Sequence, residues 1–221
     1  MIKGIIFDVD NTLIDFYRFK EESCGAAIDA MIRAGLRLNK VKARKIIYAI
    51  FDKKGLEYPK IFDDFLMKAE GRVDYRKLAH AIVAYRDRRQ AFLKPYPGVK
   101  QALTKLKKKK MKMGVLSDAP RLKAWMRLCT MNIEDYFDFI VTFDDTGERK
   151  PHRAPFEQAL RHMKLKPSEI LMVGDNSKRD IEGAKRLGMR TAFAAYGSKD
   201  RTSKADVTLR RFDDVLKLIE K

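Results

Sequence analysis

The sequence predicts an α/β fold: a doubly wound parallel sheet with a block of helices inserted after its first strand. Three observations lead to this fold class. Residues 1–8 are expected to form a strand, because Ile2, Ile5, Ile6 and Phe7 make a nearly continuous apolar run, as a parallel strand buried on both faces requires. The next 80 or so residues have helical periodicity and no clear strand. From about residue 95, short apolar runs alternate with amphipathic patterns, which is typical of right-handed βαβ units.

The individual elements follow in order along the chain. Apolar positions between residues 15 and 94 recur at three- and four-residue spacing and predict four helices, with Gly35 and Gly55 as stops for the first two. Beyond Pro97, helices are expected at 99–110, 120–131, 155–163, 177–187 and 212–219. The strands that alternate with them are expected at 111–117, 137–143, 169–174, 190–194 and 205–208.

Composition and charge exclude several classes of protein. The 221 residues include 48 Lys+Arg and 30 Asp+Glu, a net charge of +18. This excess is spread along the chain, and the one lysine run, 107–110, is typical of a solvated helix end. Without a nucleic-acid-binding motif, no nucleic-acid partner is expected. No apolar run approaches the ~20 residues that span a bilayer, and two cysteines suit a reducing compartment, so we expect a cytoplasmic protein without a membrane segment.

Polar side chains gather where the predicted strands end. Asp8 and Asp10 follow the first strand, Ser117 ends the second, Lys150 comes after the third, and Asp175 and Asp180 follow the fourth. The carboxyl ends of parallel strands meet at one edge of a sheet, where ligands bind. Acids at the end of an apolar strand are costly unless they are paired or bound to a metal. A hard divalent cation such as Mg²⁺ would offset their repulsion, and a phosphate could bridge it to the lysine.

These segments resemble the haloacid dehalogenase-like (HAD) hydrolase superfamily. Its four motifs occur in order: DVDNT at 8–12, Ser117 in VLSD, Lys150 in KP, and GDNSKRD at 174–180. The resemblance covers essentially the whole chain. It implies a Rossmann-like core formed by residues 1–15 and 95–221, with a C1-type helical cap formed by 16–94. Asn11 stands where the family commonly has Gly, a mild departure because Asn tolerates left-handed backbone geometry.

The resemblance also implies a function: a Mg²⁺-dependent phosphatase that acts on a small phosphorylated metabolite through an aspartyl-phosphate. Asp8 would be the nucleophile, and Asp10 would protonate the leaving oxygen and then activate water. Ser117 and Lys150 would bind the phosphoryl group. The remaining roles would fall to the Asp8 carboxylate, the Asp10 carbonyl and Asp175 as metal ligands, and to Asn176 and Asp180 as their supports.

Other activities stay open. Phosphomutases of the superfamily also carry an acid at the position of Asp10, whereas dehalogenases attack carbon and need none there. A phosphonate hydrolase would use a cap lysine, for which Lys20 and Lys53 are candidates. A non-catalytic, nucleic-acid-associated protein would use the charge of +18. The identity of the substrate, and the choice between monomer and homodimer, do not follow from the sequence.

Overall fold

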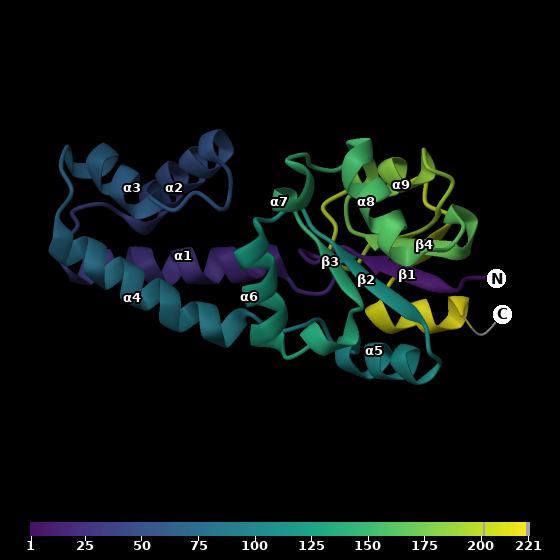
Figure 1. Cartoon of the computed structure of the whole chain (residues 1–221). Coiled ribbons are helices and arrows are strands. Elements are labelled where there is room, and N and C mark those ends of the chain that lie inside the picture. Colours follow the sequence, from purple (N-terminus) through teal and green to yellow (C-terminus); the bar gives the residue numbers. More distant parts are fainter. Residues whose placement is uncertain (201, 220–221) are drawn as a thin grey trace. The chain divides into compact units, whose positions relative to one another are not determined.

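A parallel sheet forms the centre of the larger of two units into which the chain divides (Figure 1). The computed structural model describes residues 1–200 and 202–219. Unit 1 consists of Met1–Phe16 together with the chain from Lys94 onward, and unit 2 is Tyr17–Leu93. In the described parts of the chain, every helix is too short or too polar to cross a bilayer.

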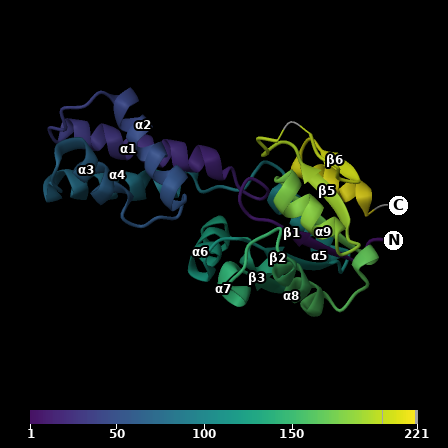
Figure 2. The ribbon, with the colours of Figure 1, turned by 90° about the horizontal axis from the view of Figure 1, so that it is seen from above.

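The sheet of unit 1 has six strands in the order β3-β2-β1-β4-β5-β6, and every neighbouring pair is parallel (Figure 2). The strands are β1 (Gly4–Phe7), β2 (Lys112–Leu116), β3 (Phe139–Val141), β4 (Ile170–Gly174), β5 (Arg190–Ala194) and β6 (Val207–Leu209). This order confirms the predicted doubly wound, Rossmann-like fold. The chain builds outward from β1 to β3 and then restarts at β4 on the other side of β1, so the ligand-binding crevice of such a sheet lies beyond β1 and β4.

Helices cover both faces of this sheet (Figure 1). α8 (Arg153–Met163) and α9 (Gly183–Lys185) pack over one face, where Phe156 is fully buried against residues of β1, β2 and β4. α5 (Val99–Lys108) and the 3₁₀ helix η4 (Phe212–Leu218) cover the other face, where the Phe7 and Phe212 rings lie 5.6 Å apart. Both faces of β1 are therefore dry, which explains its continuous apolar sequence.

Three segments differ from the sequence-based expectation. The helix expected at 177–187 is a π-helix, η3 (Ser177–Glu182), followed by the short α9, because the Asn176 carbonyl accepts from both Asp180 and Ile181 N–H groups. The strand expected at 137–143 stops early at Val141, because Thr142 forms a capping box that starts α7 (Phe143–Thr146). The final helix is 3₁₀ rather than α. The other elements of unit 1 are α6 (Arg121–Met131), η1 (Glu134–Tyr136) and η2 (Pro167–Glu169).

Helices are the only regular elements among the described residues of unit 2. Its helices are α1 (Phe16–Arg33, whose first residue belongs to unit 1), α2 (Lys40–Lys54), α3 (Ile61–Glu70) and α4 (Tyr75–Phe92). One apolar core joins all four helices, with Ile28, Ile47, Phe65 and Ala81 fully buried in it. Unit 2 therefore has an apolar core of its own.

The two chain segments that connect the units are bonded to each other. Ile14 forms an antiparallel bridge with Pro95, and the Tyr96 N–H donates to the Leu13 carbonyl at 2.9 Å. The points at which the chain leaves unit 1 and returns to it are thus adjacent.

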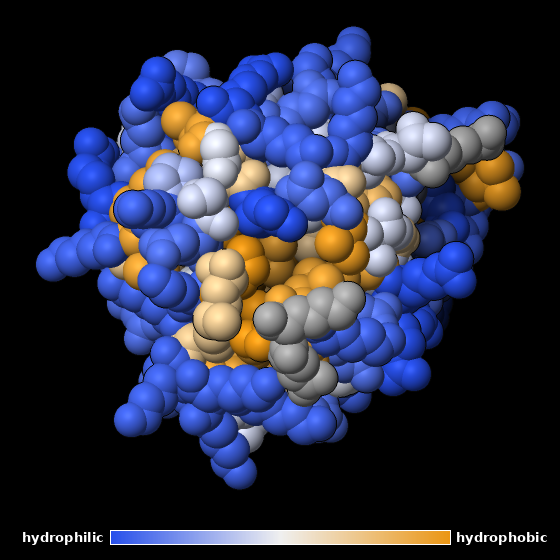
Figure 3. All heavy atoms as spheres, turned by 90° about the vertical axis from the view of Figure 1, so that its right-hand side faces the viewer, coloured by the Kyte–Doolittle hydropathy of each residue, from blue (hydrophilic) through white to orange (hydrophobic). Residues whose placement is uncertain are grey.

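The N-terminus lies on the face of unit 1 shown in Figure 3, where apolar side chains gather around a hollow. A cavity of about 410 Å³ there is lined by Met1, Ile2, Ser168, Leu171, Arg190, Thr191, Asp206, Val207, Leu218 and Ile219. It lies beside the start of β6 and the end of η4. This is not the edge of the sheet at which the predicted site residues stand.

The packing of β2 on β3 gives a test of the fold. Gly114 pairs directly with Phe139, and a Cβ at position 114 would overlap the Phe139 ring. We expect Gly114→Ala to lower the free energy of unfolding by about 1–3 kcal/mol, the usual cost of overpacking a core. Denaturant unfolding monitored by circular dichroism measures this.

The matched control is Gly25→Ala in the interior of α1. A Cβ there would meet only the Nη2 end of the Arg44 side chain, at 3.4 Å. Replacing glycine inside a helix by alanine raises the free energy of unfolding by roughly 0.5–1 kcal/mol, so the two substitutions should change stability in opposite directions. Equal stability of Gly114→Ala and the parent chain would contradict the β2–β3 packing.

Candidate active site

The site is organised around the buried ammonium group of Lys150, which lies between α7 and α8. This residue is 4% exposed. Its Nζ donates to Asp8 Oδ1 at 2.6 Å and to the Leu116 carbonyl at 3.0 Å, and it lies 2.7 Å from Asp180 Oδ1. Burial works to lower the pKa of Lys150, but the carboxylates of Asp180 and Asp8 outweigh it and raise that pKa above its ordinary value. The side chain is therefore a permanent cation at the edge of the sheet.

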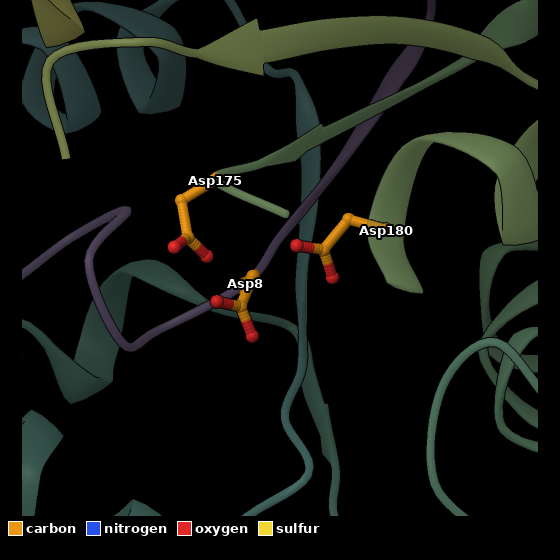
Figure 4. A group of neighbouring side chains, drawn as sticks. All are labelled: Asp8, Asp175 and Asp180. Carbon is orange, nitrogen blue, oxygen red and sulfur yellow. The ribbon is translucent and has the colours of Figure 1, made fainter. Parts of the chain in front are cut away.

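Three buried carboxyl groups converge beside this cation (Figure 4). Asp8 follows β1, Asp175 follows β4, and Asp180 comes from η3. One oxygen from each lies within 4.8 Å of the others. Asp8 and Asp175 end neighbouring strands, so the strand order itself brings them together.

Burial and mutual repulsion disfavour the charged forms of these acids. Burial raises the pKa of Asp8 above its usual range; the Lys150 charge opposes this, and the carboxylate of Asp180 adds to it. Burial likewise raises the pKa of Asp175, with further contributions from Asp8 and Asp180. The charges of Arg179 and Lys150 oppose these shifts but do not cancel them, so the cluster carries too little positive charge for three carboxylates.

The cluster fits a hard divalent cation. Asp175 Oδ1 is buried and has no hydrogen-bond partner, which is costly for a carboxylate oxygen unless something binds it. The donor atoms are carboxylate oxygens, the type that Mg²⁺ and Ca²⁺ take. A cation at this place would supply the missing charge and the missing partner at once.

The other predicted site residues lie around this cluster. Ser117 follows β2, is 4% exposed, and accepts at its Oγ from the Ala119 N–H at 3.2 Å. Asn176 caps η3 by accepting from the Arg179 N–H at 2.8 Å. Asp10 stands two residues beyond Asp8, and its side chain is 25% exposed. All seven predicted residues thus belong to unit 1.

The turn that carries the first acidic pair is tightly held. Asn11 has φ 60°, the left-handed geometry that its side chain was expected to tolerate, and its N–H donates to the Ile14 carbonyl at 2.6 Å. The Thr12 carbonyl accepts from the Tyr196 hydroxyl at 2.8 Å. Gly197 approaches so closely that a Cβ there would overlap the Asn11 carbonyl. The turn is therefore clamped by the loop that follows β5.

Two residues outside the predicted set belong to the site. Asp118 accepts from the Lys150 backbone N–H at 2.9 Å and from Arg179 Nη1 at 3.3 Å, so it fixes the segment that carries the lysine. Its position directly after Ser117, at the end of a strand, could have identified Asp118 from the sequence. Arg127 of α6 is 3% exposed and lies 3.1 Å from Asp10. Its signal was a lone cation on the otherwise apolar face of that helix.

Comparisons with known proteins agree with this geometry. A family model described as haloacid dehalogenase-like hydrolase matches residues 5–194. A glyceraldehyde 3-phosphate phosphatase of Methanocaldococcus jannaschii is 34% identical over 223 residues, covering 100% of this chain and 98% of the relative. The pyrophosphatase PpaX of Bacillus anthracis is 32% identical over 169 residues, with 73% and 76% covered.

Solved structures show the same fold. YfnB from Bacillus subtilis, determined bound to magnesium, superposes with a TM-score of 0.73 at 16% identity, covering 100% of this chain and 99% of that one. At this identity the likeness is one of fold. Together with the match to the family model over most of the chain, it leads to one conclusion. The chain belongs to the haloacid dehalogenase-like hydrolases.

Proposed function

We propose that this chain is a Mg²⁺-dependent phosphomonoesterase that acts through an aspartyl-phosphate on Asp8. The observation that carries the proposal is the meeting of Asp8, Asp175 and Lys150 at the point where the sheet reverses its strand order. A nucleophilic carboxylate, a cation site and a fixed ammonium are the parts that phosphoryl transfer requires. The phosphatase names of the relatives support the same reaction.

The chain's own groups divide the reaction into two displacements. A carboxylate oxygen of Asp8 attacks phosphorus, the bond from phosphorus to the leaving oxygen breaks, and Asp10 gives its proton to that oxygen. Asp10, now a carboxylate, then takes a proton from water, whose oxygen attacks phosphorus while the bond from phosphorus to the Asp8 oxygen breaks. Inorganic phosphate leaves and the Asp8 carboxylate is restored.

The remaining residues position the phosphoryl group and neutralise its charge. Lys150 and Ser117 hold phosphoryl oxygens, and the Lys150 ammonium keeps its charge throughout because its pKa is raised. Asp8, the carbonyl of Asp10 and Asp175 would hold Mg²⁺, with Asn176 and Asp180 behind them. When bound, Mg²⁺ supplies positive charge between the nucleophile and the phosphoryl group.

The substrate is proposed to be a small phosphorylated metabolite. Glyceraldehyde 3-phosphate is the first compound to test, because relatives named for it align over the whole chain. We assign unit 2 as the cap that selects among such substrates, in a cytoplasmic protein that is a monomer or a homodimer. A panel of phosphorylated metabolites, with pyrophosphate included, assayed for phosphate release would identify the substrate.

The role of Asp8 is tested by Asp8→Asn. The amide is a poor nucleophile, so turnover of p-nitrophenyl phosphate with Mg²⁺ should fall at least about a thousandfold, as when a covalent nucleophile is lost. Asp135→Asn, at an exposed position of η1, is the control and should retain full activity. Equal turnover by Asp8→Asn and the parent enzyme would remove Asp8 from the mechanism.

Metal binding is tested without activity, through stability and pH. In the metal-free protein the pKa of Asp8 rises from 3.8 to about 7 and that of Asp175 to about 8. A raised pKa in the folded state stabilises at low pH, and this contribution is lost as the pH rises through about 4 to 8. Because Mg²⁺ requires the deprotonated acids, its effect on the melting temperature should be larger near pH 8.5 than near pH 5.5.

Thermal unfolding with Mg²⁺ and with EDTA at both pH values measures this effect. At a Mg²⁺ concentration a hundredfold above the Kd, the stabilisation is about 2.7 kcal/mol. Asp175→Asn should lose most of the increment, whereas Asp135→Asn should keep it. An increment that is the same at both pH values, or that survives in Asp175→Asn, contradicts the proposed metal site.

A further inference from the structure

Arg127 is a buried cation that the mechanism above does not use. It lies on α6, where Ala124, Leu128 and Met131 face the interior and Trp125 is 42% exposed on the other side. The side chain of Arg127 itself is only 4% exposed. A guanidinium on the buried face of a helix is costly unless it is paired, so its partners reveal what it does.

Two contacts of this guanidinium lie within unit 1. Its Nη1 lies 3.1 Å from Oδ2 of Asp10. Its Cζ lies 4.5 Å from the centroid of the Phe16 ring, at cation–π distance. The planar group therefore has an aromatic face as one support and a carboxyl group as the other. Phe16 and Asp10 both belong to the segment that follows β1, and Arg127 joins that segment to α6.

We propose that Arg127 is a positioning residue that holds the Asp10 carboxyl group in the orientation from which it serves the leaving oxygen. This inference rests on the proposed function, in which Asp10 is the acid of the first displacement. Asp10 stands directly before the turn of residues 11–13, and its side chain is a quarter exposed, so a contact with a buried guanidinium helps to select its rotamer. Arginine suits the task, because its rigid guanidinium only donates hydrogen bonds: with Nη1 directed at Oδ2, the other oxygen of Asp10 is left to carry the proton that is transferred.

The proposal makes the effect of Arg127 depend on the leaving group. The ratio kcat/KM includes only the steps up to departure of the leaving group. An alkoxide must be protonated as it departs, whereas p-nitrophenolate departs without help. A misplaced Asp10 therefore slows the hydrolysis of an alkyl phosphate and leaves kcat/KM for p-nitrophenyl phosphate nearly unchanged. A general loss of folding or of metal binding would lower both values equally.

The experiment compares Arg127→Gln and Arg127→Lys with the parent enzyme on p-nitrophenyl phosphate and on the best alkyl phosphate of the metabolite panel. For Arg127→Gln we expect kcat/KM to fall about a hundredfold or more with the alkyl ester, the lower range for losing an acid catalyst, and only a few-fold with the aryl ester. Arg127→Lys, which keeps the charge without the fork, should lie between. Arg121→Gln, an exposed cation on the same helix, is the matched control.

Asp10→Asn separates this inference from the proposed function. If neither ester is hydrolysed by the parent enzyme, or if Asp10→Asn lowers both kcat/KM values equally, the proposed function fails. If Asp10→Asn lowers kcat/KM mainly for the alkyl ester, but Arg127→Gln lowers both kcat/KM values equally or leaves both unchanged, the role of Arg127 is overturned. The double variant should be no more selective than Asp10→Asn alone.

A second variant keeps the test valid if Arg127→Gln does not fold. Phe16→Leu removes the aromatic support, so it should show the same selectivity for the alkyl ester to a smaller extent. Equal losses of kcat/KM on both esters would refute the inference.

Discussion

The burial of one ammonium group among carboxylates is the constraint on which the rest of unit 1 depends. Lys150 contacts Asp8, Asp180 and the Leu116 carbonyl, and each comes from a different segment of the chain. An ammonium in this dry environment is tolerated only while those partners surround it, so the ends of β1 and β2, the loop before α8 and the π-helix η3 must all be in place together. The same cluster still carries more acid than base, and this imbalance prepares it for a cation.

The convergence of these side chains depends on the strand order of the sheet and on one glycine, Gly174. β1 and β4 are neighbours although most of the chain separates them, and their carboxyl ends deliver Asp8 and Asp175 to one point. Gly174 completes the arrangement, because a Cβ at this position would overlap the Asp180 side chain. The π-helical geometry of η3 then lets the Asp180 carboxylate turn back to accept from the Asn176 N–H at 3.0 Å. Gly174 and the π-helix η3 together allow the Asp180 side chain to reach the cluster.

The sequence predicted what depends on local periodicity and on the ends of strands. The strands, their parallel class and the gathering of Asp8, Ser117, Lys150 and Asp175 at one edge all follow from apolar runs that stop at polar residues. The π-helix was missed because helical periodicity does not register the contacts of Asp180 with Lys150 and with the Asn176 N–H, which accompany the π-helical hydrogen bonding. Arg127 was missed for a related reason: its partners lie more than a hundred residues earlier in the chain. Helical spacing shows that a cation is buried, but it does not show which acid receives it.

The paired connection between the units has a consequence for unit 2. Ile14 bridges Pro95, and the Leu13 carbonyl accepts from the Tyr96 N–H. For unit 1, the whole of unit 2 is therefore a loop whose two ends are held together by hydrogen bonds. An insertion at such a point leaves the pairing of β1 with β2 unstrained, whatever its length. The helical module can therefore change in length or sequence while the pairing of the sheet, and the residues at its carboxyl edge, stay in place.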